Sequence, residues 1–112
     1  MNFFTSLNKK SPMGASKIKA FTASQKSFAR VAKAIGHPAR VAIVQYLSKE
    51  SCATNKELIR ITDLSEATVH QHLRELVKAG LIAGNFIGKQ HFYRLLPSAF
   101  ERIENLKKVV DI

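Results

Sequence analysis

The sequence predicts a mainly α domain with one small β-hairpin, in the order α-α-α-α-β-β-α. Three observations support this fold class. Residues 66–79 repeat apolar side chains at helical spacing directly after a short turn. Two runs rich in aliphatic and aromatic residues, 81–86 and 91–96, follow this helix and are separated by a turn that contains glycine. A last segment, which begins close to Pro97, returns to helical spacing.

The 112 residues divide into an arm and one domain. Residues 1–22 contain four lysines and no acidic residue, which is typical of a basic N-terminal arm. The spacing of Phe3, Phe4 and Leu7 fits a short extra helix about as well as a mobile tail. Residues 23–112 are expected to form the folded domain. Because a chain of this size has a small core, burial in a partner would help its stability.

Two helices are predicted at the start of the domain. The first runs from Ser24 to Gly36, because its apolar residues share one stripe and glycine suits the left-handed position after a helix. The second begins at Pro38, which fits a first turn where no amide donor is needed, and runs to about Lys49. Its buried side is expected to hold Val41, Ile43, Val44 and Leu47.

A loop at residues 51–53 leads into a short third helix. Thr54 is its predicted N-cap, and Glu57, three residues later, completes a capping box. A turn then leads to the fourth helix, for which Ser65 is the predicted N-cap and Gly80 the stop signal.

The hairpin after the fourth helix is expected to turn at residues 87–90, near Gly88. Helix, turn, helix and hairpin in this order form a winged helix-turn-helix, here with five helices and a two-stranded wing. The fifth helix is amphipathic, because Phe100, Ile103, Leu106 and Val110 lie three or four residues apart.

The fourth helix has two unlike sides. Apolar residues gather on one side, which is expected to face the core: Val69, Leu73, Leu76 and Val77. The opposite side holds no acidic residue at its centre and is made of Ala67, Gln71, Arg74 and Lys78, with His70 at its edge. Side chains of these types hydrogen-bond to base edges or phosphates, and alanine permits close approach.

The net charge also favours a nucleic acid as the partner. Eighteen lysines and arginines against eight acidic residues give a formal net charge of +10, which favours a polyanion such as double-stranded DNA. We expect base contacts from Ala67, His70, Gln71 and Arg74. Contacts to the DNA backbone are expected from Ser65, Thr68, Lys78, Lys89, Gln90 and Arg40.

Three stretches resemble the ArsR-type (arsenic-repressor-like) regulators: residues 34–44, residues 64–73 with 78–82, and residues 88–95. The resemblance implies a homodimeric repressor, paired through its first and last helices, that leaves its operator when an effector binds. The single cysteine and the lack of a membrane-spanning run predict a cytoplasmic location. The residues do not identify that effector. Apolar side chains on these two helices exceed what one thin core can cover, and the expected dimer interface is Phe28, Val31, Ile35, Phe100, Ile103, Leu106 and Val110.

The sequence departs from the metal-sensing members of that family. Cysteines that bind metal in the third helix of many members are replaced here by Thr54 and Lys56, and the last helix contains no histidine. His70 and His72 point in nearly opposite directions from one helix, so they do not chelate together. His72 is expected to be packed, whereas His37 is a helix-entry residue and His91 is structural. We therefore expect no metal and no cofactor.

Parts of the sequence would also suit other functions. The same polar helix face would suit a winged helix that docks on another protein. Cys52, the single cysteine, would make the protein a redox-responsive repressor if it were exposed near a cation, although a packed or inert cysteine is favoured. No catalytic grouping or Gly-rich phosphate loop is present, which argues against an enzyme. No apolar run is long enough to span a membrane, so no membrane partner is expected.

Overall fold

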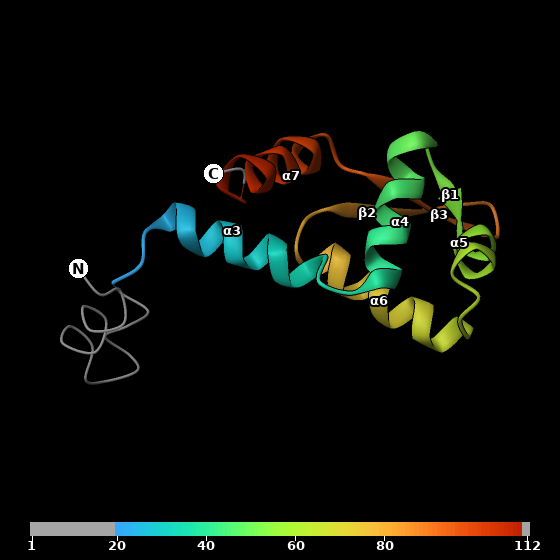
Figure 1. The fold of residues 1–112 in the computed structure, drawn as a ribbon. Helices are drawn as coiled ribbons and strands as arrows, with labels where there is room; N and C mark the ends of the chain where they lie inside the picture. The colour runs from blue at the N-terminus through green and yellow to red at the C-terminus, as the bar shows by residue number, and fades with distance from the viewer. Residues whose placement is uncertain (1–19, 111–112) are drawn as a thin grey trace.

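The computed structural model describes residues 20–110, with only the backbone of residues 109 and 110. Its elements follow the predicted order with one added strand (Figure 1). The helices are α3 (Ala23–Ala34), α4 (Pro38–Lys49), α5 (Asn55–Thr62), α6 (Glu66–Lys78) and α7 (Pro97–Val110). The strands are β1 (Ala53–Thr54), β2 (Ile82–Ile87) and β3 (Gln90–Leu95). Residues 1–19 of the predicted basic arm lie outside the described residues.

The predicted two-stranded wing of β2 and β3 is confirmed, and β1 adds a third strand to the sheet, in the order β1-β3-β2. Residues predicted as a loop form β1, which is antiparallel to β3 and pairs Ala53 with Tyr93. The hairpin turn is also shorter than predicted, because Ile87 pairs with Gln90 and only two residues connect the strands. Gly88 makes this tight connection possible, since its φ of 63° suits the first position of a two-residue turn.

Capping explains most of the helix bounds. Thr54 Oγ1 accepts a hydrogen bond from the Glu57 N–H at 3.1 Å, and Glu57 Oε1 accepts one from the Thr54 N–H at 3.3 Å, so the predicted capping box is confirmed. A second capping box, at Thr22, starts α3. The prediction that Gly36 ends the first helix in a left-handed conformation is wrong, because α3 ends at Ala34 and Gly36 does not have a positive φ.

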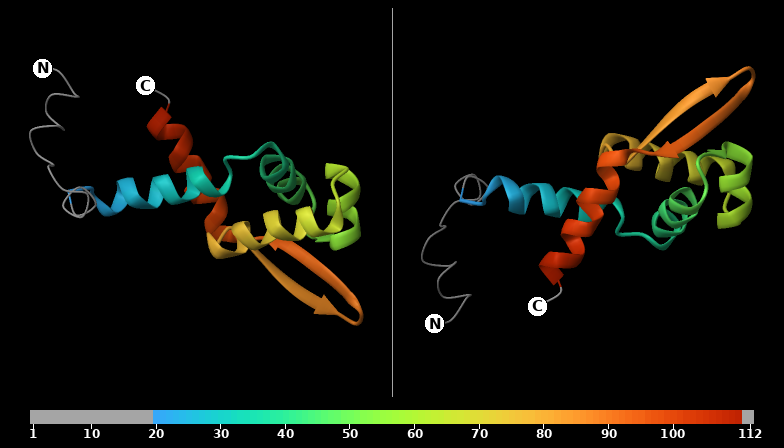
Figure 2. Two further views of the ribbon diagram at one scale, coloured as in Figure 1. Left: turned by 90° about the horizontal axis from the view of Figure 1, so that it is seen from below. Right: turned by 90° about the horizontal axis from the view of Figure 1, so that it is seen from above.

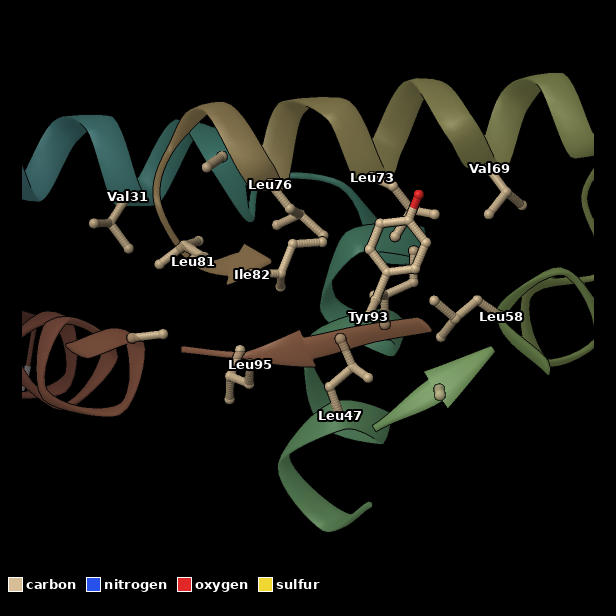
Figure 3. Packing of buried hydrophobic residues seen from close by; sticks show 14 residues of the cluster. Val31, Leu47, Leu58, Val69, Leu73, Leu76, Leu81, Ile82, Tyr93 and Leu95 are labelled. Carbon is tan, nitrogen blue, oxygen red and sulfur yellow. The ribbon is translucent and has the colours of Figure 1, made fainter. Parts of the chain in front are cut away.

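The core lies between α6, the base of the sheet and α4 (Figure 3). Val69 and Leu76 are 0% exposed and Leu73 is 1% exposed, which confirms that the apolar side of α6 faces inward. The prediction of a buried side chain is wrong for two residues. Val41 is 40% exposed because it lies on the side of α4 opposite to Ile43, and Val77 is 44% exposed because it faces the wing at the edge of the apolar side of α6.

The wing and α3 extend to opposite sides of this body, and α7 packs across α3 (Figure 2). Ala99, in the first turn of α7, is 0% exposed and anchors that helix to the core. Within residues 20–110, none of the helices has the length and apolar character needed to cross a membrane.

Candidate nucleic-acid interface

The turn before α6 fixes the start of the candidate reading helix. Asp63 ends α5 in the left-handed conformation, with φ of 53°, and its N–H donates to the Ile59 carbonyl at 3.0 Å. Aspartate is one of the few residues other than glycine that tolerate this conformation. The chain then re-enters a helix at Ser65, whose side chain accepts a hydrogen bond from the Thr68 N–H at 3.2 Å. The predicted N-cap is therefore confirmed.

The end of α6 is fixed by a Schellman motif. The Gly80 N–H donates to the Val77 carbonyl at 2.9 Å, and the Leu81 N–H donates to the Leu76 carbonyl at 3.1 Å. This pattern requires a left-handed residue after the helix, and Gly80 supplies it with φ of 74°. Because the Leu81 N–H closes the helix, β2 begins one residue later than predicted. Gly80 as the stop signal is confirmed.

Between these ends, α6 separates its residues as the sequence predicts. Val69, Leu73 and Leu76 are at most 1% exposed. On the opposite side, the predicted base-contacting and backbone-contacting residues are exposed at Ala67, Gln71, Arg74 and Lys78 and half-buried at Thr68 and His70. The Lys78 ammonium lies 3.7 Å from Glu75, but the two side chains are 66% and 42% exposed, so this ion pair is weak and leaves Lys78 available.

The two hydroxyls at the start of α6 form a pair. Ser65 Oγ donates to Thr68 Oγ1 at 2.8 Å while it also caps the helix. The hydroxyl proton of Ser65, expected to contact the DNA backbone, is therefore already accepted by Thr68. The Thr68 hydroxyl proton and the first amides of α6 are the donors that remain for an anion at this end.

A groove of about 410 Å³ lies between α6 and the wing. Four of its lining residues come from α6 and three from the wing: His70, Leu73, Arg74 and Val77, and Gly84, His91 and Tyr93. A second groove, of about 400 Å³, lies between the wing and the start of α5, and Lys56, His70, Lys89 and Gln90 line it. The structure thus brings the predicted contacts of α6 and of the wing to adjoining surfaces.

On the side of the wing, these grooves are lined by a ladder of stacked rings from Phe86, His91 and Tyr93. The rings of Phe86 and His91 lie 4.2 Å apart and nearly parallel, and the rings of His91 and Tyr93 lie 4.4 Å apart. Gly84 leaves room for the ladder, because a Cβ there would lie 2.7 Å from His91 Nε2 and 2.9 Å from the Tyr93 ring. The predicted structural role of His91 beside aromatic residues agrees with this packing.

Arg40, predicted as a phosphate contact, lies under α6. Its Nε donates to His72 Nδ1 at 3.1 Å, and its Nη1 donates to the Ala34 carbonyl at 3.2 Å. His72 is 7% exposed, which confirms that it is packed. His37 caps α4 by accepting from the Ala39 N–H at 3.0 Å, and its ring packs 4.3 Å from that of His72. The guanidinium of Arg40 therefore ties α3, α4 and α6 together, and its phosphate contact stays a prediction.

This cluster makes stability depend on pH. Burial lowers the pKa of His72 below its ordinary value of 6.5, and the charges of His37 and Arg40 lower it further. Below about pH 6.5, His72 therefore binds a proton more readily in the unfolded chain than in the folded one. The free energy of unfolding then falls by at most about 1.4 kcal/mol for each unit by which the pH is lowered. Urea unfolding between pH 5 and 8 should show this loss, and His72→Gln should reduce it. An equal loss in the variant would assign the effect to other groups.

Sequence reasoning missed one residue that positions α6. Arg102, on α7, donates from Nη1 to the Ala79 carbonyl at 2.6 Å and to the Gly80 carbonyl at 3.4 Å. It thereby satisfies carbonyls at the end of the helix, where the helix dipole also favours a cation. An arginine within an amphipathic helix gives no signal in the sequence that it caps a different helix.

The predicted dimer residues lie on α3 and α7, which pack against each other. Phe100 is 50% exposed, and the side chains of Phe28, Ile35, Ile103 and Leu106 are half-buried. Val31 is 1% exposed and packs in the core of its own chain, so the prediction that its side chain lies in the dimer interface is wrong. The side chain of Val110 lies outside the described residues.

Cys52, the residue on which the redox alternative depends, is an exposed free cysteine. Its position between α4 and β1 corrects the preference for a packed cysteine. No cluster of three or more histidine, cysteine or acidic side chains suited to a metal ion occurs in the part of the chain that the structure describes.

Comparisons with known proteins agree with this geometry. A family model described as a helix-turn-helix domain matches residues 35–85, which contain α4, α5 and α6. No curated protein matches the chain.

Similar solved structures extend the comparison beyond that segment. A possible transcriptional regulator for arsenical resistance is 28% identical, with 74% of this chain and 85% of that chain covered and a TM-score of 0.67. The transcriptional repressor PagR of Bacillus anthracis is also 28% identical, with 74% and 95% covered and a TM-score of 0.62. An ArsR family transcriptional regulator is 21% identical, with 75% and 86% covered and a TM-score of 0.65. The resemblance indicated by the motifs is thus confirmed: the chain has a winged helix-turn-helix fold and is similar to transcriptional regulators of the ArsR type.

Proposed function

We propose that the protein is a homodimeric repressor that binds a specific DNA site and leaves it when an effector binds. The observation that carries the proposal is the division of α6 into a buried apolar side and an exposed, acid-poor side that holds Gln71, Arg74 and Lys78. This face and the wing are the two surfaces with which a winged helix contacts a duplex. The proposal places the protein among DNA-binding proteins and not among enzymes.

The position of each residue on α6, the wing or α4 suggests its role in binding DNA. Ala67, His70, Gln71 and Arg74 read base edges in the major groove. Ser65, Thr68, Lys78, Lys89, Gln90 and Arg40 position the protein on the DNA backbone, with the Ser65 contribution reduced to holding Thr68. Dimerisation through α3 and α7 covers the exposed Phe100 and the half-buried apolar side chains beside it. A relative described as a transcriptional repressor supports repression as the outcome.

Selection of bound sites from random duplexes tests the proposal. A two-fold symmetric site with half-sites about one helical turn apart would support both the reading helix and the dimer. A protein-docking module need not bind duplex DNA with a steep dependence on salt between about 50 and 200 mM, so the absence of such binding would refute the proposal in favour of that alternative.

The Lys89→Ala variant tests the wing as a contact to the DNA backbone. Lys89 lies in the exposed turn of the hairpin, and its ammonium forms no ion pair within residues 20–110, so it can reach a phosphate. We expect the variant to bind all duplexes more weakly and to lower the slope of log K against log salt by about one. Titrations by fluorescence anisotropy at several salt concentrations measure that slope. Arg30→Ala, on the exposed surface of α3, is the matched control.

A further inference from the structure

The tip of the wing carries the two most exposed large apolar side chains on the part of the surface that the structure describes. Phe86 is 71% exposed and Ile87 is 66% exposed. Because they are consecutive residues of β2, their side chains lie on opposite faces of the hairpin. The tip is therefore apolar on both faces, although neither residue contributes to the core of the domain.

Phe86 is held in place. Its ring stacks on His91, and His91 packs on Tyr93, which is only 7% exposed and belongs to the core. The Tyr93 hydroxyl and His91 Nδ1 also lie 3.3 Å apart, within hydrogen-bond distance. The ladder connects an exposed ring to the interior, so less conformational entropy is lost when that ring enters a binding partner.

The surroundings of the tip are basic. Lys89 directly follows the turn glycine, and Lys56 lines the same groove as Phe86. An apolar projection with cations beside it matches a partner with anionic edges and apolar inner walls. The minor groove of DNA has this character, with phosphates along its rims and sugar carbons along its walls. His70 of α6 also lines this groove, so the tip is continuous with the reading face.

The geometry points to Phe86 and Ile87 as an apolar wedge that enters the minor groove beside the sequence read by α6. This inference rests on the proposed function and names a second element of the same interface. Two strands about 4.8 Å apart with side chains on both faces are thicker than a minor groove about 6 Å wide. Entry of the tip therefore widens the groove and bends the duplex. Flexible pyrimidine–purine steps lower the cost of that bend, so the wedge adds sequence preference without hydrogen bonds to bases.

The test compares the unmodified protein with the double variant Phe86→Ser/Ile87→Ser on a duplex recovered by selection. We expect affinity to fall by about tenfold or more, because an apolar contact is lost, with the salt slope unchanged. Energy transfer between dyes at the duplex ends should report a smaller bend. Phe86→Leu/Ile87→Val keeps the wedge apolar and should retain both affinity and bend. Val41→Ser removes another exposed apolar side chain, on α4 instead of the wing, and should bind normally.

Failure of the wedge and failure of the proposed function are distinguishable. If the unmodified protein binds and bends the duplex and the folded double variant does so equally well, the wedge is refuted and the proposed function stands. If the unmodified protein binds no duplex, both are refuted. A basic apolar tip also suits an anionic membrane surface. Loss of binding to phosphatidylcholine–phosphatidylserine vesicles in the double variant, with duplex binding intact, would therefore assign the tip to lipid and refute the wedge.

Discussion

The Arg74→Ala variant is expected to bind the preferred duplex about 1 to 3 kcal/mol more weakly and to relax base preference at one position of each half-site. Arg74 is exposed in the middle of the outward side of α6 and lines the groove toward the wing. Its guanidinium can donate two hydrogen bonds to one base edge, which alanine cannot replace. Competition titrations against duplexes that differ at single positions measure the loss at each position.

Two control variants separate the loss of a positive charge at Arg74 from the loss of its paired hydrogen-bond donors. Arg30→Ala also removes one positive charge, but from α3, so it should lower affinity for all duplexes slightly and change no preference. Arg74→Lys keeps the charge and loses the paired donors, so it should resemble the alanine variant in specificity. If Arg74→Ala keeps the full base preference of the unmodified protein, Arg74 contacts the DNA backbone and does not read a base.

The Arg102→Ala variant is expected to unfold about 1.5 to 3 kcal/mol more easily, because two carbonyls at the end of α6 lose a charged donor. For a domain of this size the loss corresponds to a melting temperature lower by about 4 to 8 °C per kcal/mol. The Gly80 turn, whose conformation depends on the same contacts, should loosen as well. Differential scanning calorimetry gives the loss in stability.

The Arg102 effect is separable from the loss of a surface charge. Lys107→Ala, in the same helix, removes an exposed ammonium whose only ion pair in the described part of the chain is with the exposed Glu104, so it should change stability little. Arg102→Lys keeps a charge near the carbonyls and should recover part of the stability. A melting temperature of Arg102→Ala equal to that of the unmodified protein would show that α6 ends without help from α7.

The features that could be predicted from the sequence are those determined by residues close together in the chain. The N-caps at Thr54 and Ser65 and the end of α6 at Gly80 depend on residues within one turn, and all three are confirmed. The apolar and polar sides of α6 follow from helical spacing alone. Val77 is the exception, because the position of the wing leaves its side exposed.

What the sequence could not predict depends on contacts between distant elements. A strand as short as β1 has no alternation to detect and forms only because β3 offers it an edge. The Arg40 contact with His72 joins residues 32 positions apart, and the Arg102 contact with Ala79 joins residues 23 positions apart. In both cases the sequence shows only a cation on a helix, and the fold decides whether that cation faces solvent or caps a neighbour.

The shortness of β1 determines how the wing behaves mechanically. Its two residues pair with β3 only at Phe92 and Tyr93, so the hairpin belongs to a three-stranded sheet at its base and is a free two-stranded ribbon from His91 to its tip. A free ribbon twists more readily than a sheet of three strands. The outer end of the hairpin can therefore adapt to the local curvature of a duplex, while its inner end keeps a constant angle to α6.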